Sequence, residues 1–450
     1  MSVELDGLRR ALEANEDGRL AAYATRSSEA TRRRPSGDEQ AEDFRLAFQR
    51  DRDRILHARA FRRLKHKTQV YMPHVGDHPR TRLTHTLEVA QLGRTIARAL
   101  ALNEDLVEAI ALGHDVGHTA FGHTGEKVLD EILRGSGAEP VLPNVVSAAA
   151  GAFKHNYQSL RVVDLLERRY ASPGLNLTDQ VREGMLKHTS WKVRFPFPLA
   201  EEGGLALGDP CHLEGQAVAV ADEIAQQTHD LEDGLRAAAV RLQGVEELAI
   251  ARRVMAEIGP SYGTDTRRWH RQSLLIRGLI RLLVTDVVTA AAARLERFST
   301  RRGITDREGF RPHERKVSQT TIWFSKAMAE EFADLKAFIY SFIINQAVVN
   351  RQDWRARKVI TALFRAFWSN PLTLPSYVLL RARDELGFPY LRDIPLSTVA
   401  GEVAARYHGS AGFARLVADH IAGMSDRFAL EEYASLEQPS PEQTFYGEPR

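Results

Sequence analysis

The sequence predicts an all-α fold, because its apolar residues recur at helical spacing over runs that are too long for strands. Four such runs cover residues 87–102, 158–170, 213–235 and 335–349. Segments in which apolar and polar residues alternate between turn dipeptides are scarce, so a sheet is not expected. Pro and Gly gather between the helical runs. We expect loops at residues 71–80, 136–145, 194–212, 259–269 and 300–314.

Two helix boundaries are indicated by individual residues. Asn103 precedes two acidic residues and then apolar positions at helical spacing, which is typical of a helix start. Gly135 and Gly137 are expected to end the helix that follows Gly125, because glycine adopts the backbone conformation of a helix terminus without strain.

Composition and length limit the class of protein. A chain of 450 residues suggests two or three packing units. The formal net charge of +2 gives no overall field that indicates nucleic acid or membrane. Cys211 is the one cysteine, which excludes a disulfide framework and a zinc site with several thiolates. The N-terminus MSVELDGLRR is charged where a signal peptide is apolar, and no apolar run could span a membrane, so we expect a cytoplasmic protein without a membrane partner.

Residues 114–126, HDVGHTAFGHTGE, gather three histidines, one aspartate and one glutamate. On a regular helix His114 and His118 would share a face, whereas Asp115 would point elsewhere. His114 and Asp115 can therefore face one metal ion only if this turn is distorted. The glycines beside them make such a turn feasible.

Two residues far away in the sequence belong with this segment. His85 begins an apolar-striped helix, and Asp222 lies in AVAVADEIA, where nearly all neighbours are apolar. An ionised aspartate there is costly unless it is paired with a cation. Asp222 capped by an arginine, and histidines that are satisfied core imidazoles, remain alternatives. Together, His85, His114, Asp115 and Asp222 offer N and O ligands that suit Mn, Fe, Co, Ni, Mg or Zn.

Six strings, in this order, carry a resemblance to a known family. They are FQRDRDRILHARAFRRLKHKTQV (48–70), RTRLTHTLEVAQLGR (80–94), GHDVGHTAFGHTGE (113–126), FKHNYQSLRVV (153–163), ADEIAQQTHDLEDG (221–234) and HIAGMSDRFA (420–429). Together they resemble the deoxyguanosinetriphosphate triphosphohydrolase family of the HD phosphohydrolase superfamily. The resemblance extends over about residues 30–430.

The resemblance implies an HD-domain helical core with an additional C-terminal helical region. Two polar stretches at the ends of the chain, RSSEATRRRPSGDEQAED and ASLEQPSPEQTFYGEPR, lie outside this organisation. We expect a mobile N-terminal arm over 1–43, the catalytic core over 44–235, the C-terminal helical region over 236–433 and a flexible tail over 434–450.

The activity implied by the resemblance is hydrolysis of a dNTP at the α-phosphate, which yields a deoxynucleoside and inorganic triphosphate. The family's metal ligands match His85, His114, Asp115 and Asp222. The expected cofactor is a divalent ion, first Mg²⁺ or Mn²⁺, with Fe, Co, Ni and Zn as alternatives.

The leaving 5′ oxygen needs a proton, and three residues match positions that can supply or orient it. His123 and Glu126 match the family's catalytic pair. Three residues apart, they can meet across one turn, so that Glu126 orients His123 and keeps it charged. His155 is a second candidate for the acid or for a phosphate contact. His118 is expected to support the ligand His114, with a substrate contact as the alternative.

A triphosphate requires cations. Residues 50–67 hold eight Lys or Arg and two Asp, and these cations either bind phosphate or form a solvated helix face. Arg82 lies three residues before His85 and matches the family's phosphate-contacting arginine. Lys187, in LKHTSW, is a further phosphate candidate.

The deoxyribose is expected at Gln69 and Asp230, which match positions that hold the 3′-hydroxyl in related triphosphohydrolases. Gln226 is a departure, because the family usually has a Tyr there that helps to exclude a 2′-hydroxyl. This difference concerns the discrimination between sugars and leaves the cleavage chemistry unchanged.

Two alternatives to a dNTP triphosphohydrolase remain. One is another HD-superfamily nucleotide phosphohydrolase or phosphodiesterase. The other is a non-catalytic nucleic-acid-binding regulator that uses the basic segment 50–67. The resemblance also implies a homo-oligomer, with a hexamer as one form, and a second dNTP as effector. Single-stranded DNA is a further candidate partner.

Overall fold

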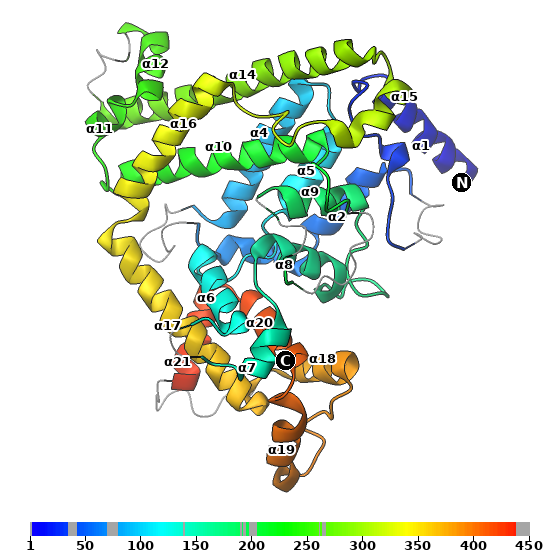
Figure 1. Cartoon of the computed structure of the whole chain (residues 1–450), viewed down its shortest axis with the longest axis vertical. Helices are drawn as coiled ribbons and strands as arrows, with labels where there is room; N and C mark the ends of the chain where they lie inside the picture. The colour runs from blue at the N-terminus through cyan, green and yellow to red at the C-terminus, as the bar shows by residue number, and fades with distance from the viewer. Residues whose placement is uncertain are drawn as a thin grey trace.

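The computed structural model describes residues 2–34, 43–69, 80–137, 140–189, 191, 195–197, 205–260, 262 and 267–437. Within these ranges the chain forms helices and no β-strand, and only two isolated antiparallel bridges join Arg32 to Thr178 and Thr68 to Thr81. The all-α prediction is therefore confirmed (Figure 1).

The α-helices range from four residues in α15 to 35 residues in α14. Their bounds are α1 Ser2–Asp17, α2 Ala47–Leu56, α3 Arg59–Arg63, α4 Arg82–Ala99, α5 Glu104–Gly113, α6 Gly122–Arg134, α7 Asn144–Ala150, α8 His155–Arg161, α9 Asp179–Lys187, α10 Leu213–Arg236, α11 Leu242–Glu246, α12 Ala249–Ile258, α14 Arg268–Arg302, α15 Arg307–Phe310, α16 Lys326–Ile339, α17 Ala347–Ser369, α18 Ser376–Leu386, α19 Leu396–Glu402, α20 Ala411–Ala422 and α21 Asp426–Glu437. The 3₁₀ turns are η1 Ser27–Glu29, η3 Leu64–His66, η6 Arg311–Lys316 and η8 Pro371–Thr373. Turns with π geometry are η5 Val162–Leu166, η7 Tyr340–Ile344 and η9 Val403–Tyr407.

The start of α5 predicted from Asn103 and the end of α6 predicted from Gly135 are confirmed. The Asn103 side chain accepts a hydrogen bond from Leu106 N at 3.1 Å and caps α5. Gly135 ends α6 with a positive φ of 65°, which a residue with a Cβ rarely adopts.

Two of the predicted runs differ from the structure. The run over 158–170 ends at Leu166, and the run over 335–349 contains a 72° bend between Ile344 and Ala347. Apolar periodicity does not distinguish one straight helix from two helices that meet at an angle, because both bury one face. The expected loop over 300–314 contains α15, and that over 71–80 falls almost entirely outside the described residues.

The core consists of two hydrophobic clusters. The first is built around α2, α4, α5, α9, α10, α14 and α16, and the second around α6, α7, α17, α18, α20 and α21. They occupy the upper and lower parts of Figure 1. The division of the chain at residue 235 stays a prediction. Residues from each side of this division nevertheless pack in the cluster formed mainly by the other side. Residues 275–343 join the first cluster, and residues 120–153 join the second.

The histidine-rich segment passes from one cluster to the other. Val116 belongs to the first cluster, whereas Ala120 and Phe121 belong to the second. The side chains between them therefore lie where the two clusters meet, in the part of Figure 1 between α5 and α6.

The described part of the N-terminal segment is packed against the rest of the molecule, which corrects the expectation of an arm over 1–43. Ser27 donates to the buried Glu16 carboxylate from its N and Oγ, at 2.8 and 2.7 Å. Thr25 donates in the same way to Glu214 of α10, at 2.8 Å for each atom. The polar residues that suggested an arm therefore satisfy buried carboxylates. Residues 35–42 lie outside the described part.

No single helix in the described ranges is long and apolar enough to cross a membrane. The helical segments Lys326–Ile344 and Ala347–Ser369 meet at a bend. They have the length and composition of a membrane span only when they are counted together.

We expect Gly117→Ala to destabilise the protein, because the new methyl group has no space. A Cβ there would lie 2.1 Å from Ser159 N and 2.4 Å from His155 O, which are backbone atoms of α8. Overpacking typically costs about 1–3 kcal/mol, and backbone atoms cannot turn aside as a side chain can. Urea denaturation measures the free energy of unfolding. Gly7→Ala is the control, since nothing lies within 4 Å of its added Cβ, and we expect no loss of stability there. Equal stability of both variants and the parent would contradict this packing.

Candidate active site

The end of α5 places two adjacent residues in one site. The helix stops at Gly113, and His114 and Asp115 lie in the turn that follows it. The His114 Nδ1–H donates to Ala111 O at 2.6 Å, so Nε2 carries the free lone pair. This Nε2 is buried and has no hydrogen-bond partner among the described residues. A buried imidazole nitrogen without a partner fits a bound cation.

The structure brings all four predicted metal ligands together. His85 Nε2 lies 2.9 Å from Asp222 Oδ1. His114 Nε2 lies 3.4 Å from Asp115 Oδ1 and 3.8 Å from Asp222 Oδ1. Donors about 2 Å from one ion lie on the order of 3 Å apart, so these separations suit a metal after small adjustments. Two imidazoles and two carboxylates therefore fit a divalent ion.

Both carboxylates of this group stay ionised. Burial raises the pKa of Asp222, but the hydrogen bond from His85 and the charges of His114 and His85 lower it below the usual range. Burial also raises the pKa of Asp115, and His114, His118 and Arg82 lower it well below that range. The four donors thus offer two negative charges to a cation.

Two residues that the sequence analysis missed, His229 and Glu88, position the ring of His85. Its Nδ1 lies 3.4 Å from Nδ1 of His229, which is paired in turn with Glu88. His229 lies on α10, two turns after Asp222, and no local motif distinguishes it. Such a partner fixes the ring that presents the other nitrogen to a metal.

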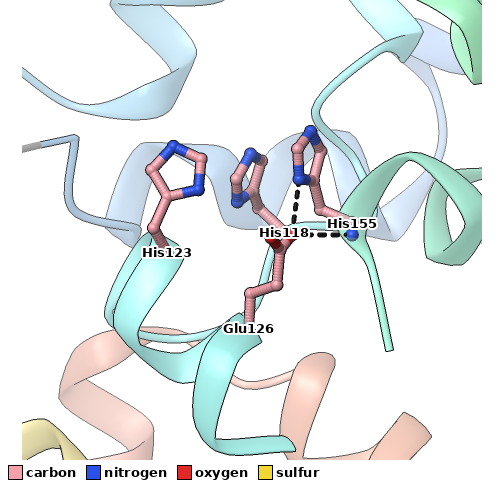
Figure 2. Close-up of side chains that lie close together, drawn as sticks. All are labelled: His118, His123, Glu126 and His155. Carbon is pink, nitrogen blue, oxygen red and sulfur yellow. Dashed lines mark hydrogen bonds and ion pairs between the residues drawn. The ribbon is translucent and has the colours of Figure 1, made fainter. Parts of the chain in front are cut away.

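A second group lies beside the first and contains His118, His123, Glu126 and His155. Figure 2 shows two contacts from the Glu126 carboxylate to His155 and none to His123. His155 donates from its backbone N at 2.8 Å and from Nδ1 at 2.5 Å. The predicted pairing of Glu126 with His123 is therefore wrong in this structure. Proximity in sequence suggested it, but the start of α8 brings His155 closer.

His118 joins the two groups. Its ring stacks on His155 with centroids 3.9 Å apart and planes at 14° (Figure 2). Its Nε2 lies 3.1 Å from Asp115 Oδ1. His118 therefore orients Asp115, where the spacing had indicated support of His114.

His123 sits at the first turn of α6, where the chain bends sharply. Phe121 and Gly122 both have positive φ, at 60° and 57°, and this bend turns His123 toward a cavity that it lines. The side chain is exposed to this cavity, yet the surrounding protein and the nearby Arg82 lower the pKa of His123 to about 4. Its imidazole is therefore neutral at pH 7.

His188 is a further site residue that the sequence analysis missed. It follows α9 as His114 follows α5, and its Nδ1–H donates to Met185 O at 2.7 Å. Its Nε2 lies 3.3 Å from Nε2 of His155, and its donor atom is within 4.8 Å of those of His114 and Asp222. Burial, with the charges of His114 and His155, lowers its pKa to about 3. The one signal in the sequence that could have indicated His188 is its place next to Lys187 at the end of a helix.

The cavity beside His123 has a volume of about 280 Å³. It contains the predicted sugar residues Gln69, Gln226 and Asp230. The buried Gln69 Oε1 has no hydrogen-bond partner among the described residues. Burial and the neighbouring Asp233 raise the pKa of Asp230 to about 8, so this carboxyl keeps a proton at neutral pH and can donate.

The two predicted phosphate cations differ. Arg82 is buried, donates from Nη1 to Asp115 Oδ2 at 2.7 Å, and has an Nε without an acceptor among the described residues. Lys187 donates to Glu183 Oε1 at 3.0 Å and to the carbonyls of Ala206 and Asp209 at 2.8 Å. Three acceptors saturate an ammonium group, so Lys187 has no proton for a phosphate.

Comparison with known proteins agrees with this geometry. Residues 82–226 match the HD domain, and residues 322–387 and 388–435 match the phosphohydrolase-associated domain. The matched HD segment begins at Arg82 and contains both groups of candidate ligands. The chain is therefore an HD-domain phosphohydrolase, and a hydrolase by class.

Relatives that match nearly the whole chain narrow the family. A deoxyguanosinetriphosphate triphosphohydrolase-like protein of Geobacter sulfurreducens is 39% identical over 97% of this chain and 99% of its own length. Relatives with this description from Bordetella pertussis and Mesorhizobium japonicum are 38% and 37% identical, over 93% and 94% of this chain and 96% of their own lengths. The chain belongs to the deoxyguanosinetriphosphate triphosphohydrolase-like family, as its sequence motifs predicted.

We expect Asp222→Ala to lose bound metal, because it removes one of the two anionic donors. Elemental analysis after gel filtration measures the metal that each protein retains. Glu223→Ala is a matched control on the same helix, since Glu223 pairs with Lys336 at 2.7 Å and lies outside the donor group. Full retention of metal by Asp222→Ala would contradict its assignment as a ligand.

Proposed function

We propose that this protein is a metal-dependent dNTP triphosphohydrolase, which cleaves a dNTP at the α-phosphate to a deoxynucleoside and inorganic triphosphate. The observation that carries the proposal is the contact between two groups. A four-donor N/O site for a divalent ion adjoins the His155–Glu126 pair, and His118 touches both. A metal next to a proton donor suits the displacement of an alkoxide from phosphorus.

His85, His114, Asp115 and Asp222 would hold the ion, for which Mg²⁺ or Mn²⁺ is the first choice. When bound, the ion polarises a phosphate oxygen and lowers the pKa of a water molecule. Arg82 is proposed to contact the substrate phosphate through its Nε, while its Nη1 keeps Asp115 in place. A charge-assisted hydrogen bond in a buried site is stronger than a neutral one.

His155 is the proposed proton donor to the leaving 5′ oxygen, and its hydrogen bonds support this choice over His123. Its Nδ1–H donates to the Glu126 carboxylate, and its Nε2 faces Nε2 of His188. His188 already donates its Nδ1–H to Met185 O, so its Nε2 is the acceptor in that contact. His155 then carries a proton on each ring nitrogen, as an acid requires.

Glu126 and His123 have different parts in this proposal. Burial raises the pKa of Glu126, but the charge and hydrogen bonds of His155 lower it to about 2, so it stays a carboxylate that stabilises the charged His155. His123 has no such partner and is neutral at pH 7. It is proposed to contact the substrate from the cavity wall.

The sugar is proposed to lie in the cavity that Gln69, Gln226 and Asp230 line. The protonated Asp230 can donate to the 3′-oxygen, and the free Gln69 Oε1 can accept from its proton. Both contacts are directional. Together they would recognise a hydroxyl without contact to the base.

Four further parts of the proposal come from the sequence and its family resemblance. They are a homo-oligomeric state, a second dNTP as effector, single-stranded DNA as a partner and a cytoplasmic location. The alternative activity is another HD-type nucleotide phosphohydrolase or phosphodiesterase. A non-catalytic regulator is less well supported, because a binding module needs neither a metal site nor an adjoining acid.

Product analysis tests the activity directly. The metal-loaded protein is incubated with each dNTP, alone and in pairs, and the products are resolved by ion-exchange chromatography. Deoxynucleoside and tripolyphosphate are expected. A nucleoside monophosphate with pyrophosphate, or free phosphate alone, would instead support the alternative activity. A dNTP that is cleaved only in the presence of another would indicate an effector.

We expect His155→Gln to keep metal and to lose turnover by about 10²–10⁴-fold, because the leaving oxygen is no longer protonated. With p-nitrophenyl triphosphate, whose leaving group needs no proton, the loss should be much smaller. His123→Gln is the matched control and should lower both rates by similar factors. If His123→Gln, and not His155→Gln, showed dependence on the leaving group, the two roles would be exchanged.

We expect Gln226→Tyr to sharpen discrimination against ribonucleotides. Gln226 lies four residues after Asp222 on α10 and lines the same cavity as Asp230. A Tyr ring there would fill space beside the sugar, whereas Gln can hydrogen-bond a 2′-hydroxyl. The ratio of kcat/KM for a dNTP and its matching rNTP measures the effect. An unchanged ratio, with both proteins folded and metal-loaded, would leave Gln226 a packing residue.

A further inference from the structure

A second large cavity, which shares no lining residue with the cavity beside His123, lies between α1, residues 27–34 and the start of α2. These elements lie on one side of the molecule (Figure 1). The volume of the cavity is about 920 Å³. Its charged lining consists of two acidic residues and seven arginines, namely Asp6, Glu13, Arg9, Arg10, Arg32, Arg33, Arg34, Arg45 and Arg50.

Most of these arginines have carboxylate partners. The pairs are Arg9–Asp6, Arg10–Asp6, Arg32–Asp51, Arg33–Asp164 and Arg45–Asp53. Arg34 and Arg50 have no carboxylate partner among the described residues. Arg34 donates from Nη2 to the carbonyl of Pro173 at 2.7 Å. Two guanidinium charges of this cavity are therefore not neutralised by direct pairing.

Arg50 is the unusual member. Only 7% of it is exposed, and its Nε is enclosed without an acceptor. In the described part of the chain its guanidinium has no hydrogen bond and no ion pair. Burial and the charges of Arg32 and Arg54 lower its pKa, although the charges of Asp43 and Asp51 act in the opposite direction. A buried guanidinium among cations is costly unless an anion compensates for it.

The neighbouring Asp51 cannot serve as this anion, and Asp43, whose charge also acts on Arg50, is paired with Arg45. Asp51 directly follows Arg50 in α2, but both of its carboxylate oxygens already accept hydrogen bonds. Oδ1 accepts from Arg32 Nη1 at 2.7 Å, and Oδ2 accepts from Thr178 N at 2.7 Å. Arg50 also lines an adjoining cavity of about 620 Å³. The unpaired charge therefore faces space that a ligand can enter.

We propose that this arginine cavity, centred on Arg50, binds a small phosphate-bearing anion, with inorganic polyphosphate as its simplest form. A guanidinium presents N–H groups in a planar fork that matches phosphate oxygens. Arg34 adds a second charge without a carboxylate on the same cavity. This inference does not depend on the proposed hydrolase activity, because none of these residues lines the cavity beside His123.

Calorimetry with inorganic tripolyphosphate on the metal-free full chain tests the proposal. We expect Arg50→Gln to lower the affinity of one class of tripolyphosphate sites by about tenfold or more. This factor is the usual contribution of a charge-assisted hydrogen bond. Arg427→Gln removes the same charge at an exposed position that pairs only with Glu431, and it should bind as the parent does. Equal affinity of Arg50→Gln and the parent would overturn the proposal.

Thermal unfolding gives an independent measurement. Tripolyphosphate should raise the Tm of the parent, because a ligand that binds the folded state stabilises it. Arg50→Gln should show a smaller rise, and without anion its Tm should equal or exceed that of the parent, since an uncompensated buried charge has been removed. If Arg50→Gln fails to fold, Arg50→Lys replaces it and should show a reduced rise. An undiminished rise in the substituted protein would contradict the assignment.

A third arm separates a small anion from a nucleic-acid backbone. A single-stranded oligodeoxynucleotide is titrated into the parent and into Arg50→Gln. Binding of tripolyphosphate that depends on Arg50 supports the proposal. If the oligonucleotide binds in a way that depends on Arg50 and tripolyphosphate does not bind, the proposal is overturned, and the cavity is a nucleic-acid surface instead.

Discussion

The direct contact between Gly117 and α8 holds the candidate active site together. The Gly117 N–H donates to Ser159 Oγ at 2.9 Å, and the Ser159 hydroxyl donates to His114 O at 2.8 Å. No Cβ fits between these backbones, so the turn after α5 and the first turn of α8 behave as one unit. This contact places His155 against His118. Two of the proposed metal ligands, His114 and Asp115, and the proposed acid His155 therefore come from one packed unit.

The burial of this assembly sets the charges within it. Burial lowers the pKa of His118 and His188, which keeps these imidazoles neutral. Nearby cations and imidazoles lower the pKa of Asp115 and Asp222 although burial acts in the opposite direction. Ionised carboxylates are the form that a metal ion binds, so Asp115 and Asp222 need not lose a proton before binding.

The C-terminal helices support the same segment from the other side. Asp426 at the start of α21 accepts from Phe121 N at 2.8 Å and from Thr68 N at 2.7 Å. Buried Lys67 donates to the carbonyls of His118 and Ala422. The phosphohydrolase-associated region therefore positions the bend before His123. This dependence explains why the hydrophobic clusters cross the expected boundary between core and C-terminal region.

The sequence by itself determined the all-α class, the family and the capping of α5 and α6. It also indicated His85, His114, Asp115 and Asp222 as candidate metal ligands, because their chemical types and positions in strings of family motifs are visible without coordinates. Only the tertiary structure decided which distant groups meet. It paired Glu126 with His155, brought His188 into the site, saturated Lys187 and left the Arg50 guanidinium without a partner among the described residues. Local spacing reports neighbours within a few helical turns, whereas hydrogen-bond partners and buried charge depend on how separate helices pack.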